Sequence, residues 1–155
     1  MKVRNGFVSN SSSSSFIVAF PVIPQSKDEI KELLFGSEAK FPHPYQDYSI
    51  PTDVIADAIW SDLKPPISKD EAVEEARGSL EGGPELNWTE HVSDADYDNY
   101  DLESKKYAEL KIDEFVKENG SNIFMFEYSD HSDLGSAMEH GGIFSRIPHI
   151  VVNKH

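Results

Sequence analysis

The sequence predicts an α+β fold, in which a small mixed or antiparallel sheet is covered by three to four helices. Two observations lead to this class. Short apolar runs typical of strands stand near both ends of the chain, and the segments between them repeat apolar residues at helical spacing. The length of 155 residues suits one hydrophobic core, so we expect a single domain over residues 1–155.

Three runs are expected to form the sheet, at residues 16–20, 123–128 and 147–153. The first is apolar at every position, which indicates burial on both faces of a sheet. The second is rich in aromatic residues, which favour strands. Pro148 has no backbone N–H, so the start of the third strand should lie at a sheet edge or a bulge. The order of the strands does not follow from these patterns.

Helix starts are marked by serine residues with an acidic residue three positions later. Ser26 with Glu29, and Ser68 with Glu71, have the spacing of a capping box. Glycines and a proline pair stand where the periodic segments end. The helices are expected at residues 27–35, from 51 or 52 to 64, 69–81, about 102–119, and 134–140.

Two segments are expected to lack regular structure. Residues 1–14 contain most of a low-complexity serine run, so we expect this N-terminal segment to be mobile. Residues 84–101 interleave acidic and aromatic side chains with little helical or strand periodicity. They are therefore predicted to form an exposed, irregular segment.

The composition excludes several classes of site. The chain has no cysteine, which removes disulfides, thiolate zinc sites, iron–sulfur clusters and cysteine nucleophiles. A cytoplasmic location fits this composition best. No apolar run approaches the length of about 20 residues that a membrane-spanning helix needs, so we do not expect an integral membrane protein.

The charge is strongly negative and unevenly distributed. With 14 basic and 28 acidic side chains, the formal net charge is −14, which opposes direct contact with nucleic acid phosphates or anionic membranes. Between residues 70 and 103, twelve carboxylates stand against one basic residue, Arg77. This tract is either a solvating surface or a face for a basic protein partner.

The preferred functional hypothesis is a non-enzymatic protein-binding module. Its acidic tract would occupy the basic groove of a partner, such as a nucleic-acid-binding protein. Closely spaced aspartates imitate the charge of a nucleic acid backbone, and tyrosines between them serve as amphipathic anchors. The expected contact residues are Asp94, Asp96, Tyr97, Asp98, Tyr100 and Asp101.

A C-terminal group of acidic and histidine residues supports the alternative hypothesis, a metal-dependent hydrolase acting on a phosphoester. We expect Asp130, His131 and His140 as ligands of a divalent metal, and His131, His140 and Glu139 as acid/base groups. A metal-activated water needs no nucleophilic side chain. Ordinary turn and capping chemistry with solvated histidines explains the same residues without a site. No other cofactor is expected.

The serine run immediately precedes the first strand. Successive small residues leave backbone N–H groups and hydroxyls free to surround an anion, as phosphate-binding nests do. A glycine-rich loop and a following helix are missing, so a mobile surface is the competing interpretation. The expected phosphate ligands are Ser11, Ser12, Ser13, Ser14 and Ser15.

The opening Arg4-Asn5-Gly6-Phe7-Val8-Ser9-Asn10, followed by five serines, Phe16 and Ile17, resembles the start of small uncharacterised proteins from bacteria and phages. The segment 127–149, with Glu139-His140-Gly141, is similar to the ends of some of them. The resemblance implies a bacterial, phage or mobile-element source and no particular activity. A fixed opening of this kind also suits a recognition tag read by another protein, with Phe7, Asn10 and Phe16 as contact residues.

Overall fold

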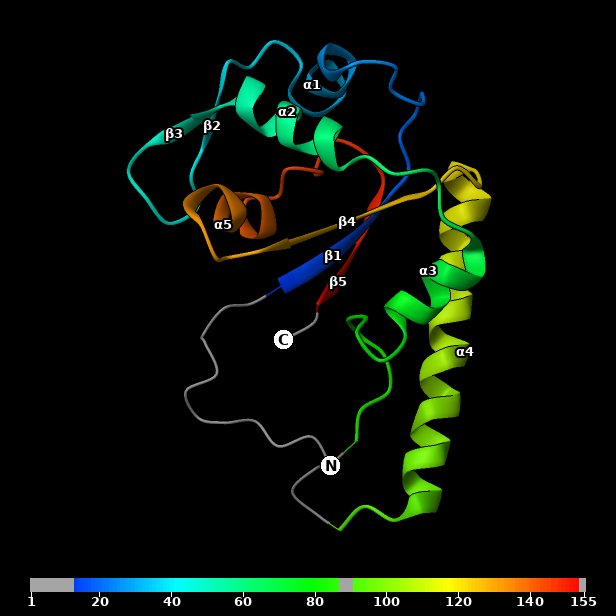
Figure 1. Ribbon diagram of the computed structural model, residues 1–155. Coiled ribbons are helices and arrows are strands. Elements are labelled where there is room, and N and C mark those ends of the chain that lie inside the picture. The colour runs from blue at the N-terminus through cyan, green and yellow to red at the C-terminus, as the bar shows by residue number, and fades with distance from the viewer. Residues whose placement is uncertain (1–12, 87–90, 154–155) are drawn as a thin grey trace.

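The computed structural model describes residues 13–86 and 91–153. In this part of the chain the α+β prediction is confirmed, with five helices and two antiparallel sheets (Figure 1). Three strands form the main sheet, in the order β4-β1-β5, and β2 and β3 form a hairpin. The elements are β1 (Ser13–Val18), α1 (Lys27–Phe35), β2 (Lys40–Pro42), β3 (Ser49–Pro51), α2 (Thr52–Asp62), α3 (Lys69–Ala76), α4 (Asp94–Asn119), β4 (Phe124–Ser129), α5 (Asp133–His140) and β5 (His149–Asn153).

Strand β1 is the centre of the main sheet. Phe16 lies opposite Phe126 of β4 and Val151 of β5, and both pairings are antiparallel. Residues 16–20 are all buried, so the expected burial of this run on both faces is confirmed. Strand β5 begins just after Pro148 and lies at the edge of the sheet, where a residue without a backbone N–H is tolerated.

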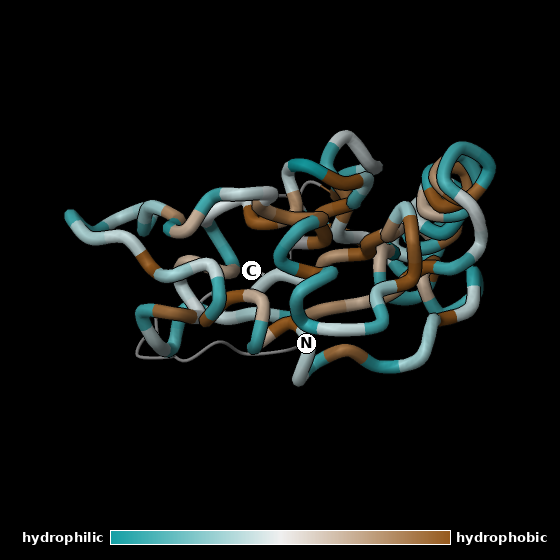
Figure 2. The backbone as a smooth tube through the Cα atoms, turned by 90° about the horizontal axis from the view of Figure 1, so that it is seen from above, coloured by the Kyte–Doolittle hydropathy of each residue, from teal (hydrophilic) through white to brown (hydrophobic). Residues whose placement is uncertain are grey.

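Helices cover both faces of the sheet, and each face has its own hydrophobic cluster. Phe16 and Val18 pack with α1, α2 and α5, whereas Ile17 and Ala19 pack with α3 and α4. The alternation follows from the strand period of two. Viewed from above, apolar segments gather between the layers, and α4 stands at one side (Figure 2). β1 therefore joins two helical layers into one fold.

Side-chain caps begin α1 and α3 at the predicted serines. Ser26 Oγ accepts from Glu29 N–H, while the Glu29 carboxylate accepts from Gln25 N–H. Ser68 and Glu71 form the full reciprocal capping box. Each cap satisfies N–H groups that the first helical turn leaves without partners.

The prediction for residues 84–101 is wrong over its second half, because α4 begins at Asp94 rather than near Leu102. Ser93 Oγ accepts from Asp96 N–H, and the Asp96 carboxylate accepts from Ser93 N–H. These bonds lower the pKa of Asp96. Carboxylates in a first helical turn also interact favourably with the helix dipole. The acidic composition therefore starts this helix rather than preventing it.

The N-terminal prediction needs a second correction. Ser13 and Ser14 belong to β1, where they pair with Ser129 and Tyr128, so the expected mobility is wrong for these two residues. The rest of that prediction, for residues 1–12, lies outside the described residues. Phe7 and Asn10 lie outside the described residues, and Phe16 is buried in the core and not available as an exposed contact. Among the described helices, none has the length and apolarity required to cross a membrane.

Candidate metal centre

Three side chains from the C-terminal third of the chain converge on one point. One carboxylate oxygen each of Asp130 and Glu139 and one imidazole nitrogen of His140 all lie within 4.8 Å of one another. Asp130 follows β4 directly, and Glu139 and His140 form the end of α5. The turn between β4 and α5 thus folds the helix back over the end of the strand it follows.

Glu139 forms the buried side of this group. Its residue exposure is 6%, and its side chain is fully buried. Ser14 in β1 donates a hydrogen bond from Oγ to Glu139 Oε1 at 3.3 Å. Moving a carboxylate out of water is costly unless hydrogen bonds or opposite charges compensate for the lost hydration. The position of Glu139 therefore favours a positive charge beside it.

His140 supplies the solvent-facing side of the group. Its Nε2 lies 3.1 Å from Glu139 Oε2, and 26% of its side chain is exposed. The ring of Tyr45, from the β2–β3 hairpin, lies beside it at a centroid distance of 5.5 Å. Asp130 is half-buried. The group is therefore buried on the side of Glu139 and open to water on the side of His140.

Local hydrogen bonds fix the start of α5. Ser132 Oγ accepts from Gly135 N–H as the helix cap. A Cβ at Gly135 would clash with the Ser129 carbonyl oxygen, so this close approach of helix and strand end requires glycine. The apolar side of the helix, with Ala137 and Met138, packs into the cluster on that face of the sheet.

The β2–β3 hairpin is attached to the same helix. His43 Nε2 donates to the Asp133 carbonyl at 3.0 Å, while its Nδ1 accepts from Tyr45 N–H. Desolvation, together with the hydrogen bond and charge of Asp133, raises the pKa of Tyr48. At the other end of α5, a Cβ on Gly141 would lie 2.8 Å from the Phe41 ring. These contacts hold Tyr45 beside His140.

The donor set suits a divalent cation. Two carboxylates and one imidazole are ligands typical of Zn²⁺, Mn²⁺ and related ions. Bonds of about 2 Å place two ligand atoms of one ion no more than about 4 Å apart. The three donor atoms here, all within 4.8 Å of one another, have a spacing close to that range. A cation would also compensate the buried Glu139 carboxylate.

The structure brings together some of the residues predicted for this site and places another apart from them. Asp130 and His140, two of the three predicted ligands, belong to the converging group, and Glu139, predicted as an acid/base group, completes it. His131 is exposed and lies outside this group. Asp133, at the start of the same helix, binds the hairpin through its carbonyl and carboxylate.

Two residues of the serine run, Ser14 and Ser15, contact carboxylates. Ser14 donates to Glu139, and Ser15 Oγ lies 2.9 Å from Glu75 Oε1 and 3.5 Å from Glu127 Oε2. Ser13 starts the strand, and Ser11 and Ser12 lie outside the described residues. Carboxylates beside the hydroxyls repel a phosphate, so this geometry gives the phosphate hypothesis no support.

The expected protein-contact residues divide into two sets on α4. Asp94, Tyr97 and Asp98 are exposed, and Tyr97 is 51% exposed. Asp96 is also exposed but forms the capping box. Asp101 pairs with Arg77, and Tyr100 is half-buried beside Gly78. The first set is exposed and takes no part in the cap or in the ion pair, although the Tyr97 ring lies 6.4 Å from that of Tyr100.

Sequence reasoning did not identify Tyr45 and His43. Both stand in the run Phe41-Pro42-His43-Pro44-Tyr45, which carries no spacing that indicates contact with residue 133 or 140, since about ninety residues separate them. Ser14 was proposed for an anion, although its hydroxyl donates to a carboxylate. Only the fold reveals these three roles.

Comparison with known proteins adds no assignment. The chain matches no protein-family model, and searches of curated proteins and of solved structures found no match.

Proposed function

We propose that the protein binds a divalent transition-metal ion through Asp130, Glu139 and His140. The observation that carries the proposal is the convergence of these three donor atoms around a carboxylate with no exposed side-chain surface. Ser14 orients this carboxylate from the central strand, as outer residues commonly orient metal ligands. His140 and Asp130 reach the ion from the solvent side.

Three protein ligands leave coordination positions open to water, the arrangement of catalytic rather than structural metal sites. A metal ion in such a site lowers the pKa of bound water and polarises a phosphoryl or carbonyl oxygen. Hydrolysis of a phosphoester is therefore the reaction class that follows from the proposal. Tyr45 lies beside His140 and can contact a substrate that approaches from solvent.

Calorimetric titration with Zn²⁺ and with Mn²⁺ tests the metal site. We expect saturable binding of one ion per chain that weakens as the pH falls, because the ligands must be deprotonated. Glu139→Gln should abolish or strongly weaken it while keeping the shape of the side chain. His131→Gln is the matched control and should bind like the original protein. Equal binding by both variants, or no saturable binding at all, would refute the site.

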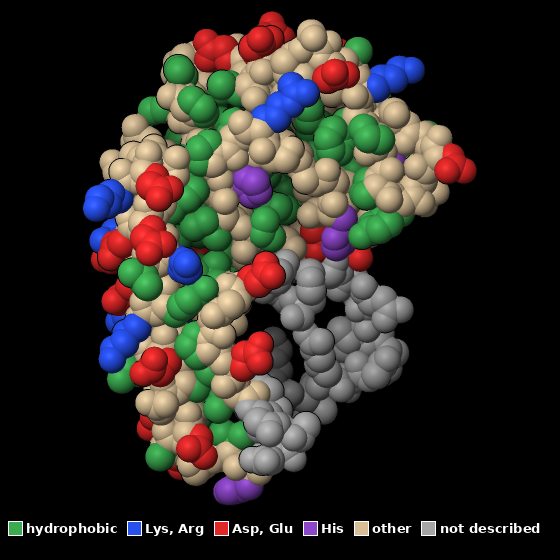
Figure 3. All heavy atoms as spheres, turned by 180° about the vertical axis from the view of Figure 1, so that it is seen from behind, with side chains coloured by type: hydrophobic (Ala, Val, Ile, Leu, Met, Phe, Trp, Pro, Cys, Tyr) green, Lys and Arg blue, Asp and Glu red, His purple; other side chains and the backbone are tan. Residues whose placement is uncertain are grey.

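A second candidate function is binding of a basic protein at the N-terminal end of α4. The observation that favours it is the exposure of Asp94, Tyr97 and Asp98, with Leu102 one turn further on and 51% exposed. Residues at this spacing lie on one side of a helix. Acidic side chains accompany apolar ones over the surface seen in Figure 3.

Polylysine is a simple probe of this second candidate. We expect its binding to weaken as salt rises and to weaken further in the double variant Asp94→Asn, Asp98→Asn. A matched double variant on another surface, Asp28→Asn with Glu32→Gln in α1, should change binding much less. Binding reduced equally by both double variants would show attraction to overall charge alone and would exclude a specific face.

A further inference from the structure

The outer edge of β5 presents backbone groups that no described strand pairs with. Ala19 N–H donates to the Pro148 carbonyl at 3.0 Å, which makes these residues a hydrogen-bonded pair between β1 and β5. Because such pairs alternate along an antiparallel ladder, Ile150 and Val152 also bond to β1. The N–H and C=O groups of His149 and Val151 therefore point away from the sheet. No strand in the described part of the chain pairs with this side of β5.

This edge lacks the features that usually prevent strand addition. Proteins commonly protect exposed edges with charged residues, prolines or bulges. The five residues of β5 are His149-Ile150-Val151-Val152-Asn153, with no charged residue or proline, and Val151 is 39% exposed. The opposite edge strand, β4, carries the exposed Glu127 near its middle. Of the two edges, β5 is the one suited to receive another strand.

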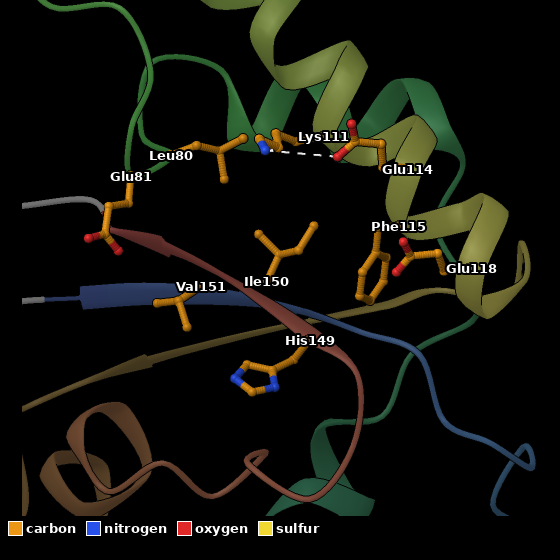
Figure 4. A pocket seen from close by; sticks show the side chains of 9 residues that line it. All are labelled: Leu80, Glu81, Lys111, Glu114, Phe115, Glu118, His149, Ile150 and Val151. Atoms are coloured by element: carbon orange, nitrogen blue, oxygen red, sulfur yellow. Dashed lines mark ion pairs between the residues drawn. The ribbon is translucent and has the colours of Figure 1, made fainter.

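A groove of about 400 Å³ runs beside this edge, between β5 and α4. Figure 4 shows Ile150 pointing from the strand toward Leu80 and the helix, with Phe115 beside it. Val151 and His149 point to the other side of the strand. An added strand would therefore place alternate side chains in the groove and the others beside Val151.

The rim of the groove is acidic. Among the described residues that line it are Glu81, Glu114 and Glu118, together with a single lysine, Lys111, which lies 3.8 Å from Glu114. The carboxylates stand at both the loop and the helix side of the groove (Figure 4). Lys111 compensates only part of this charge, so the groove is complementary to cationic side chains.

We infer that the β5 edge binds an extended, basic segment of another protein, which adds to the main sheet as a fourth strand. Its backbone bonds to His149 and Val151, and alternate lysine or arginine side chains lay their aliphatic stems on Phe115, Leu80 and Ile150. Their charged ends reach the glutamates of the rim. Small apolar residues at the intervening positions pack beside Val151.

A second copy of the chain is a poorer occupant of the same edge. Pairing β5 with β5 would bring the three glutamates of one rim toward those of the other, and each chain has a net charge of −14. Like charges brought together in this way oppose association. The inference is independent of the metal site and uses a different part of α4 from Asp94 and Asp98.

A short synthetic peptide that alternates valine with lysine is the probe, and its binding is followed by fluorescence anisotropy. We expect saturable binding that weakens with salt, and little binding of the same peptide with glutamate in place of lysine. Two further versions carry N-methyl groups on one or the other set of alternate residues. Because an added strand pairs through only one set, one version should bind and the other should lose binding, at about fivefold per lost hydrogen bond. Equal binding by both versions, or no binding of the lysine peptide, would overturn the inference.

Variants of the protein give an independent test. Val151→Pro removes an N–H that points away from β1, so the sheet should persist while peptide binding falls at least about fivefold. Glu114→Gln with Glu118→Gln should weaken binding and its salt dependence, whereas Glu109→Gln, elsewhere on α4, should not. Unchanged binding in the first two variants contradicts the inference. A concentration-dependent dimer that Val151→Pro abolishes would assign the edge to a second copy and also overturn it.

Discussion

Tyr128 shows how burial and a neighbouring charge act on a single residue. The residue is 9% exposed, and its hydroxyl donates to Asp62 Oδ2 at 3.2 Å. Burial first, and then the charge and hydrogen bond of Asp62, raise the pKa of Tyr128 far above its ordinary value of 10.0. The folded protein therefore holds the proton of Tyr128 more tightly than the unfolded chain does.

This difference predicts alkaline destabilisation. A raised pKa contributes stability that is present below the ordinary pKa of tyrosine and is lost as the pH rises above about 10. Urea unfolding across this range should show a falling free energy of unfolding for the original protein. Tyr128→Phe should cost about 1 kcal/mol at neutral pH, through the lost hydrogen bond, and should show a smaller alkaline decline. An identical decline in both proteins would assign it to other groups.

The sequence indicates which kinds of side chain form the candidate site, but it does not indicate how they are arranged. Asp130, Glu139 and His140 could be selected because carboxylates and imidazoles gathered near the C-terminus. The choice between His131 and His140 depends on the direction in which the turn leaves β4, which short-range patterns do not determine. The burial of Glu139 depends on Ser14, 125 residues away along the chain. Such long-range contacts have no local signal.

At the scale of elements, the first turn of α4 depends on its cap. Ser93→Ala removes the acceptor for Asp96 N–H and should destabilise the helix start by about 1 kcal/mol. Hydrogen exchange of the amides at residues 94–98 should accelerate, while exchange near Ile112, in the buried part of the helix, should change little. Ser121→Ala, outside any helix, is the control. Unchanged exchange at residues 94–98 would show that the cap is not what holds this turn.

The elements themselves are largely predictable because their signals are local. Ser26 and Ser68, each with a glutamate three positions later, mark the starts of two helices. The apolar run at residues 16–20 marks the central strand. The start of α4 is not predicted, because Ser93 and Asp96 lie within a segment of interleaved acidic and aromatic residues that shows little helical periodicity. The short β2–β3 hairpin was missed because Pro42 and Pro51, which lie within it, are unfavourable in most strands.

For the whole molecule, β1 connects two helical layers that do not otherwise share a core. Ile17 is fully buried on the face covered by α3 and α4. Ile17→Ala should lower the free energy of unfolding by about 2–5 kcal/mol, since it leaves a cavity in the central strand. Because both clusters include β1, circular dichroism and hydrogen exchange in α2 and α4 should report one common transition. The exposed Val54→Ala is the control, and separate transitions for the two layers would contradict a single cooperative fold.

The order of the strands was beyond sequence reasoning, because β1 pairs with partners more than one hundred residues away. Its continuous apolar character indicated burial on both faces, which is what a central strand between two helical layers requires. The concentration of acidic residues was also visible in the sequence. The fold decides which of these acidic residues cap α4, which pair with Arg77 and which stay exposed at the end of the helix.

The metal site is the central claim, and electron spin echo spectroscopy of the Mn²⁺-loaded protein tests it most directly. A bound imidazole adds a nitrogen modulation to the Mn²⁺ signal. We predict this modulation in the original protein and in His131→Gln, and its loss in His140→Gln, because only His140 belongs to the converging group. A spectrum without nitrogen modulation, or one that His140→Gln leaves unchanged, would contradict the assignment.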